Sequence, residues 1–336
     1  RYFYAMNFTN LNSIFSKANG KKIVVIGDIM LDRYLLGNVT RISPEAPVQV
    51  FDIGTSENKL GGAANVAYNI KTLGAEPLLI GVCGNDDEGK ILKKVFEDLG
   101  ISTEGIIAEA NRNTTCKTRV IAAAHHLIRL DSESRTKISE ESSGSILKIL
   151  EETKNDFDII ILEDYNKGVL TKSLIHSVIE FAKENSKKIL VDPKFENFFE
   201  YKDVFLFKPN RKELEDAILK RTDGIDELTE RAKDFIKKIN CKNLVLTLGE
   251  HGMLLIENNN DKIEIVKVPT QARKVSDVSG AGDTVISTIA VCLAGGAEVK
   301  ESVIIANFAA GLVVEEVGIV PIYKDILIEH LVERDV

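Results

Sequence analysis

The octapeptide Asp277-Val278-Ser279-Gly280-Ala281-Gly282-Asp283-Thr284 runs directly into the apolar residues 285–293, a pattern typical of a turn that opens a buried helix. Gly280, Ala281 and Gly282 have no side chain larger than a methyl group, so a ligand can approach their backbone closely. The first turn of such a helix points unpaired N–H groups and the positive end of its dipole at that ligand. These features together predict an anion hole for a phosphoryl group.

Asp283 lies in the first turn of that helix, beside the predicted anion hole. Its carboxylate can take a proton from a hydroxyl that attacks the phosphoryl group, which is the minimum equipment for phosphoryl transfer to an alcohol. The alternative is a glycine-rich turn whose aspartate only satisfies a helix N-terminus. The unbroken run from Gly280 to Asp283, with Asp277 three positions before it, favours the functional interpretation.

Upstream of this motif, apolar runs that fit buried strands alternate with segments of helical periodicity. Strands are expected at residues 21–27, 77–82, 157–162, 188–191, 204–207 and 243–248, and helices at residues 65–73, 87–99, 139–151, 172–184, 211–220 and 226–239. The alternation predicts an α/β fold with a mostly parallel sheet covered on both faces. Ligands of such sheets bind beyond the carboxyl ends of the strands.

Two segments, residues 48–53 and 116–129, interrupt the alternation and fit half-exposed strands. They predict a small sheet built from about residues 35–56 and 112–131 that projects over the site as a lid and excludes water. The alternative is an edge extension of the main sheet. We expect one domain over residues 21–336 with this lid, preceded by an extension or helix over residues 1–20.

Charge and composition exclude several classes of function. The net charge of −8 gives no overall basic surface for nucleic acid or anionic membranes. No apolar run approaches the roughly 20 residues of a membrane span. The segment Arg1-Tyr2-Phe3-Tyr4-Ala5 precedes Met6 and is left out of functional reasoning. We therefore expect a cytoplasmic protein whose partners are small molecules, with neither a nucleic-acid nor a membrane partner.

Cysteine and histidine spacing argues against a metal centre of the zinc type. Four cysteines lie far apart and are expected to be reduced thiols: Cys83, Cys116, Cys241 and Cys292. His125 and His126 are neighbours in a predicted strand, so their side chains point to opposite faces and cannot share a metal ion.

Two polar motifs follow the first strands. Asp28, at the end of the first strand, can accept hydrogen bonds from sugar hydroxyls, although a turn or cap residue is the alternative. Gly61 and Gly62 form a turn that opens a helix, with Asn65 facing the cleft, and the glycines permit close substrate approach. The run Gly61-Gly62-Ala63-Ala64-Asn65 departs from G-x-G-x-x-G, which argues against a nicotinamide enzyme.

Further motifs follow later strands. Asn210 and Glu213 form a predicted capping box, and the same geometry places the Glu213 carboxylate near a nucleotide's Mg²⁺, directly or through water; both can hold together. Lys167 and Lys194 can offset phosphate charge, although a lone lysine is usually only solvated. The turn Thr247-Leu248-Gly249-Glu250-His251-Gly252 can border a nucleotide. Asn307 can lie by its base or ribose, or its small-residue helix face can serve helix packing alone.

Taken together, residues 20–330 resemble the ribokinase-like (PfkB) family of sugar kinases. The stretches 27–34, 41–48, 60–67 and 269–272, with Ile128-Arg129-Leu130-Asp131 and Asp164-Tyr165-Asn166-Lys167-Gly168, look like the kinase domain of the heptose-7-phosphate kinase/ADP-heptose synthase proteins. The resemblance implies a three-layer sandwich with a β lid. It also implies ATP-dependent phosphorylation of the C1 hydroxyl of D-glycero-β-D-manno-heptose 7-phosphate, for ADP-heptose and lipopolysaccharide core synthesis. Mg²⁺, a monovalent cation and a homodimer formed through the lid are further implications.

The resemblance also implies roles for individual residues. Asp283 matches the catalytic base, and Gly280, Ala281 and Gly282 match the anion hole. The sugar contacts would be Asp28, Asp32, Gly61, Gly62 and Asn65, and the lid and substrate-phosphate contacts Arg41, Glu45, Lys117, Arg119 and Arg129. The nucleotide contacts would be Asp192, Lys194, Asn210, Glu213, Thr247, Gly249, Gly252, Asp277 and Asn307, with Glu213 on Mg²⁺.

The chain departs from the family pattern at two places. Glu163 stands where the pattern has a serine, and residues 317–322 replace a segment that contains Gly-Thr. The cytidylyltransferase-like domain of the bifunctional members is not expected, so a separate adenylyltransferase would be needed. The alternatives are a kinase of this fold for another sugar, sugar phosphate or nucleoside, a catalytically silent sugar-binding protein, and last an oxidoreductase.

Overall fold

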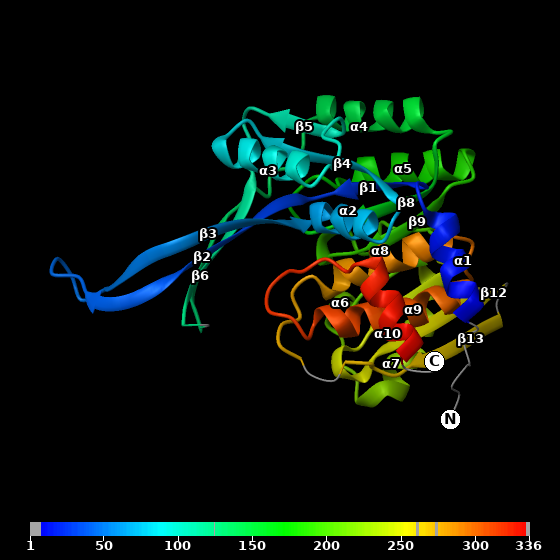
Figure 1. Cartoon of the computed structure of the whole chain (residues 1–336). Helices are drawn as coiled ribbons and strands as arrows, with labels where there is room; N and C mark the ends of the chain where they lie inside the picture. The colour runs from blue at the N-terminus through cyan, green and yellow to red at the C-terminus, as the bar shows by residue number, and fades with distance from the viewer. Residues whose placement is uncertain (1–7, 124, 260–261, 273–274, 334–336) are drawn as a thin grey trace.

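A nine-stranded sheet forms the centre of the described structure, in the order β13-β12-β11-β10-β9-β8-β1-β4-β5 (Figure 1). The computed structural model describes residues 8–123, 125–259, 262–272 and 275–333, so the segment Arg1-Tyr2-Phe3-Tyr4-Ala5 lies outside the described residues. Every pair from β5 to β11 is parallel, whereas β12 pairs antiparallel with β11 and β13 pairs antiparallel with β12. The strands are β1 (Lys22–Gly27), β4 (Glu76–Gly84), β5 (Ile106–Glu109), β8 (Phe157–Glu163), β9 (Lys188–Asp192), β10 (Leu206–Phe207), β11 (Asn243–Thr247), β12 (Met253–Asn259) and β13 (Lys262–Val268).

Helices cover both faces of this sheet, because successive residues of a strand point to opposite sides. In β1, Ile23 and Val25 enter one core cluster, whereas Val24 and Ile26 enter the other. The first cluster lies under α1 (Phe8–Ala18), α2 (Ala63–Thr72), α3 (Asp87–Asp98), α8 (Ala281–Ala294), α9 (Val299–Val313) and α10 (Lys324–Glu333). The second lies under α4 (Glu140–Thr153), α5 (Lys172–Glu184), α6 (Arg211–Ala217) and α7 (Gly224–Lys238). The predicted mostly parallel, doubly covered sheet is confirmed.

The expected elements differ from the observed ones mainly at their ends. Helix α6 stops at Ala217, short of the expected residue 220, and Leu219 has a φ of 54°, a left-handed conformation that cannot continue a helix. The strand expected at residues 204–207 is reduced to Leu206–Phe207. Strand β5 was not predicted, because its four residues are too few to show a periodic pattern.

A second sheet of four strands, in the order β3-β2-β6-β7, projects from one end of the body (Figure 1). Its strands are β2 (Ile29–Ile42), β3 (Gln49–Gly62), β6 (Thr115–Ala122) and β7 (His125–Ser132). It is mixed, since β2 pairs antiparallel with β3 but parallel with β6. The lid sheet is therefore separate from the central sheet, and the edge-extension alternative is wrong. The first two strands begin earlier and end later than the expected segment 35–56, whereas β6 and β7 nearly coincide with the expected segment 112–131.

Very short connections join the lid sheet to the body. A single residue, Asp28, separates the end of β1 from the start of β2, and α2 begins immediately after β3 ends at Gly62. Among the described residues, no helix combines the length and the apolar character that crossing a membrane requires.

Candidate active site

The structure contains the predicted glycine turn directly before α8. Gly280 caps the helix with a φ of 79°, a left-handed conformation that costs glycine little. Asp277 holds the turn from below, because its carboxylate accepts hydrogen bonds from the amides of Ser279 (2.9 Å) and Gly318 (3.1 Å). The Ala281 amide already donates to the Val278 carbonyl oxygen at 3.3 Å. The amides that can bind an anion in the predicted hole are therefore the neighbouring ones in the first turn of α8.

A cavity of about 650 Å³ lies beside this helix start, at the carboxyl ends of β9 and β11. The predicted residues that line it are Gly280, Ala281, Gly282, Asp283, Asp192, Lys194, Asn210, Glu213, Thr247, Gly249, Gly252 and Asn307. Asp277 is absent from the cavity wall, so its predicted nucleotide contact is corrected to a role in holding the turn. The size and position of the cavity suit a nucleotide in a parallel α/β sheet.

Asp283 lies on the cavity wall but is nearly closed off from solvent, with 2% of its surface exposed. One carboxylate oxygen accepts a hydrogen bond from Asn65 Nδ2 at 2.7 Å, and the other accepts one from the Tyr165 hydroxyl, also at 2.7 Å. Burial raises the pKa of Asp283 to about 6, although these two donors act in the opposite direction. A carboxylate of this pKa is ionised at neutral pH and still basic enough to accept a proton.

The glycine turn before α2 places Asn65 against Asp283, and its two glycines are closely packed against other parts of the chain. A Cβ on Gly61 would lie 2.0 Å from Asp32 Oδ2, and a Cβ on Gly62 would lie 2.4 Å from the Asp28 carbonyl oxygen. The space at both positions is filled by the chain itself. The two glycines therefore permit this close packing, and the close approach of substrate to them stays a prediction.

Asp28 holds the loop that follows β8. Its buried carboxylate accepts hydrogen bonds from three backbone amides, those of Tyr165 (2.8 Å), Lys167 (3.0 Å) and Val169 (3.1 Å). This geometry fits the capping alternative, and the sugar contact of Asp28 stays a prediction. By fixing the loop after β8, Asp28 positions the Tyr165 hydroxyl on Asp283.

One predicted sugar contact, Asp32, and two predicted lid residues, Lys117 and Arg119, lie close together on β2 and β6. Asp32 and Arg119 form an ion pair whose side chains are 3% and 12% exposed. Lys117 lies next to Asp32 in the strand register, and its ammonium stands 5.4 Å from the centroid of the Tyr165 ring. Burial lowers the pKa of Lys117, so this ammonium lies in an environment that an anion would stabilise.

The other predicted lid residues are not brought to Asp283 within this chain. Arg41 lies at the end of β2 and Glu45 in the turn beyond it, at the far end of the projecting hairpin (Figure 1). Arg129, on β7, is exposed and forms an ion pair with Asp131 at 2.8 Å. The predicted contacts of these three residues with substrate find no support in the geometry of one chain.

The predicted nucleotide segment before α6 has the expected cap. The Asn210 side chain accepts a hydrogen bond from the Glu213 amide at 2.8 Å, and the Glu213 carboxylate accepts one from the Asn210 amide, also at 2.8 Å. Lys194 forms an ion pair with the other Glu213 oxygen, and all three residues line the cavity. Asn307 donates to the Pro269 carbonyl oxygen at 2.7 Å while bordering the same cavity.

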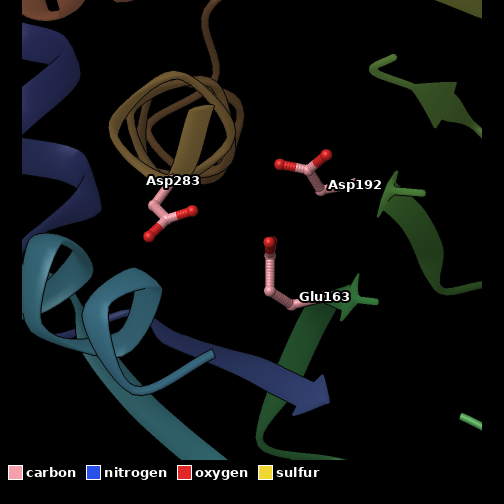
Figure 2. A group of neighbouring side chains, drawn as sticks. All are labelled: Glu163, Asp192 and Asp283. Carbon is pink, nitrogen blue, oxygen red and sulfur yellow. The ribbon is translucent and has the colours of Figure 1, made fainter. Parts of the chain in front are cut away.

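Three residues absent from the predicted site lie at its centre: Tyr165, Lys208 and Glu163. Lys208 forms a buried ion pair with Asp192 at 2.8 Å. The Glu163, Asp192 and Asp283 carboxyl groups come together from β8, β9 and α8 (Figure 2). Polar residues directly after apolar runs were a signal for all three, because the carboxyl ends of neighbouring parallel strands meet at one edge.

Comparisons with known proteins agree with this geometry. The family model described as pfkB family carbohydrate kinase matches residues 20–324. The chain is 40% identical over 313 residues to the bifunctional protein HldE of Pelobacter propionicus, covering 93% of this chain and 64% of that protein. It is 40% identical over 315 residues to the HldE protein of Geobacter sulfurreducens, covering 93% and 63%. The chain thus spans less than two thirds of the length of these relatives.

Solved structures show the same fold at low sequence identity. Arabidopsis thaliana ribokinase, solved with ribose and ATP, has a TM-score of 0.72 and 18% identity, with 93% of this chain and 99% of that chain covered. Phosphofructokinase-2 from Escherichia coli, solved with potassium, has a TM-score of 0.74 and 19% identity, with 94% and 99% covered. The expected ribokinase-like sandwich is confirmed.

Proposed function

Since the chain belongs to the pfkB family of carbohydrate kinases, we propose that it transfers the terminal phosphoryl group of ATP to the C1 hydroxyl of D-glycero-β-D-manno-heptose 7-phosphate. The product would serve the formation of ADP-heptose for the lipopolysaccharide core. The observation that carries this proposal is Asp283, ionisable on the wall of the cavity, at the first turn of a helix and held by Asn65 and Tyr165.

In the proposed reaction, ATP lies in the cavity with its terminal phosphate at the start of α8. Backbone amides and the helix dipole there stabilise the charge that develops on the transferred group. Asp283 accepts the proton of the attacking hydroxyl, and the pKa of about 6 matches that task near neutral pH. Tyr165 and Asn65 keep both carboxylate oxygens oriented, and each oxygen has a second lone pair that can accept a hydrogen bond from the sugar hydroxyl.

The nucleotide brings Mg²⁺ in kinases of this fold. The Glu213 carboxylate on the cavity wall is an oxygen ligand of the kind that Mg²⁺ takes, directly or through water, and its position beside Lys194 and the cap of α6 fits a metal bound mainly by phosphates. Bound there, the ion offsets phosphate charge. A monovalent-cation site stays a prediction.

The choice of a phosphorylated heptose is supported by the lid and by the relatives. Lys117 and Arg119 place two cations on the same face of β6, Lys117 over the Tyr165 ring and Arg119 over the Tyr34 ring. Of the two, Arg119 has a carboxylate at salt-bridge distance, that of Asp32. A substrate phosphate would pair with Lys117 and replace the solvation that this ammonium has lost. The two HldE relatives, each 40% identical, support heptose as the sugar.

The substrate is tested by measuring ADP release with a panel of sugars, sugar phosphates and nucleosides. We expect the highest kcat/KM with heptose 7-phosphate. Turnover of fructose 6-phosphate or adenosine but not of heptose 7-phosphate would assign another substrate, and sugar binding without ADP release would favour the silent binding protein. In Lys117→Met, KM for the phosphorylated sugar should rise by about 10-fold or more with a smaller change in kcat, since one charge-assisted contact is lost.

The lid also supports a proposed homodimer. It exposes large apolar side chains, namely Ile42, Val48, Ile53, Leu127, Ile128 and Leu130. Large apolar side chains exposed on one small sheet are typical of an interaction surface. Sedimentation should show a dimer that Ile53→Asp dissociates, whereas a monomeric wild-type protein would refute this arrangement. A cytoplasmic location is part of the proposal, because ATP is found there and the four cysteines are all unpaired and buried.

A further inference from the structure

Glu163 is a buried acid with no partner. It is 0% exposed, and neither of its carboxyl oxygens has a hydrogen-bond partner among the described residues. Figure 2 shows its carboxyl group directed at the space between Asp192 and Asp283. Asp192 likewise has one buried oxygen, Oδ1, without a partner, although its Oδ2 pairs with Lys208. Burying unpaired polar oxygens is costly, so this space calls for a cation or a proton.

The charges around this space do not balance. Three carboxyl groups meet there, and Lys208 is the ammonium in direct contact with them. Lys194 is engaged by Glu213. Burial, together with Asp192 and Asp283, raises the pKa of Glu163 well above its usual range. With all three acids ionised, the cluster and Lys208 carry two negative charges in excess, which a divalent cation would neutralise.

The spacing of the oxygens suits one ion. One oxygen from each of the three carboxyl groups lies within 4.8 Å of the others. Ligand oxygens about 2.0–2.6 Å from a common Mg²⁺, Mn²⁺ or Ca²⁺ are separated by up to about 4–5 Å. The donor set contains oxygen alone, which selects hard divalent cations rather than zinc or copper.

We propose that Glu163, Asp192 and Asp283 form a binding site for a hard divalent cation, Mg²⁺ or Mn²⁺, that takes up its ion in the absence of nucleotide. The site is separate from the Glu213 carboxylate, which faces Lys194 and the helix cap. It uses Glu163, the residue at which this chain departs from the serine of the family pattern. The inference rests on the three carboxyl groups and holds whichever sugar is phosphorylated.

The test is a titration of the nucleotide-free full chain, stripped with a chelator, with Mn²⁺ at pH 7.5, following free Mn²⁺ by electron paramagnetic resonance. We expect one Mn²⁺ per chain, displaced by Mg²⁺, and a rise in the melting temperature on binding. Glu163→Gln keeps the size of the side chain and removes its charge, so Mn²⁺ should bind at least about 10-fold more weakly. The matched control is Glu250→Gln, which removes an exposed carboxylate from the same cavity and should leave Mn²⁺ binding unchanged.

Asp192→Asn is the second variant, and circular dichroism reports whether each variant is folded. The proposal is overturned if the wild-type chain binds no Mn²⁺, or if the folded Glu163→Gln and Asp192→Asn variants bind it as the wild type does. Weakened binding in Glu250→Gln alone would also overturn it, because the ion would then lie elsewhere in the cavity. Neither ATP nor sugar is present, so this outcome is independent of the proposed kinase reaction.

Discussion

Replacing Asp283 by asparagine should make the protein more stable while it loses activity. The carboxylate is 2% exposed and its pKa is raised from 3.8 to about 6. Ionisation of Asp283 therefore lowers the free energy of unfolding. A shift of roughly two pKa units corresponds to about 3 kcal/mol. Asparagine carries no charge, and it can still accept from Asn65 and donate to the Tyr165 oxygen.

The sign of the pH dependence follows from the direction of the shift. A raised folded-state pKa means that the protonated acid stabilises the fold at low pH, and that this stability is lost as pH rises from 3.8 through about 6. The stability advantage of Asp283→Asn should therefore grow from about 1.5 kcal/mol at pH 5 to about 3 kcal/mol at pH 8. Urea unfolding of both chelator-treated proteins at the two pH values measures this difference.

Activity provides the second readout of the same substitution. Loss of a general base should lower kcat by about 10²–10⁴ and leave nucleotide binding largely intact. The wild-type kcat/KM should fall as pH drops through about 6, where Asp283 takes up a proton. Turnover close to wild type would remove Asp283 from the mechanism. A stability difference that is the same at pH 5 and pH 8 would refute the reasoning about its burial.

Three further substitutions test the groups around Asp283. Tyr165→Phe removes a donor to the carboxylate at 2.7 Å, so the acid limb of the pH–rate profile should move to higher pH; an unmoved limb would contradict this contact. Asp28→Asn leaves one acceptor oxygen for three amides and should cost about 1–3 kcal/mol in urea unfolding, with a fall in kcat because Tyr165 is displaced; wild-type stability would show that the loop holds without it. Gly61→Ala places a Cβ 2.0 Å from Asp32 Oδ2 and should destabilise by at least about 1–3 kcal/mol. Its control, Gly144→Ala, meets no atom within 4 Å in the interior of α4 and should stabilise by about 0.5–1 kcal/mol.

The parts of this structure that local sequence determines were predictable. Alternating apolar strands and amphipathic helices carry their own periodicity, so the covered parallel sheet could be predicted before any contact was known. The turn at Gly280 was equally local, because small residues, an acid and an apolar helix follow one another within a few positions.

Features set by distant partners were not predictable. Asp28 is suited both to a cap and to a sugar contact, and its capping role depends on the amide of Tyr165, which is 137 positions away in the sequence. Glu163 ends an apolar strand, where a polar residue usually meets solvent; its burial depends on Asp192 and Asp283 from other elements. The β2–β3 hairpin was predicted too short at its inner ends, because residues 29–34 and 57–62 are largely buried and lack the half-exposed pattern on which the prediction was based.

The four-stranded sheet is joined to the body at two short connections, at Asp28 and at Gly62. At the first connection, the Asp28 carboxylate accepts a hydrogen bond from the backbone amide of Tyr165. At the second connection, α2 begins and carries Asn65. Both of these residues hold the carboxylate of Asp283. The base of the four-stranded sheet is thus connected, through Asp28 and through α2, to both residues that hold the Asp283 carboxylate.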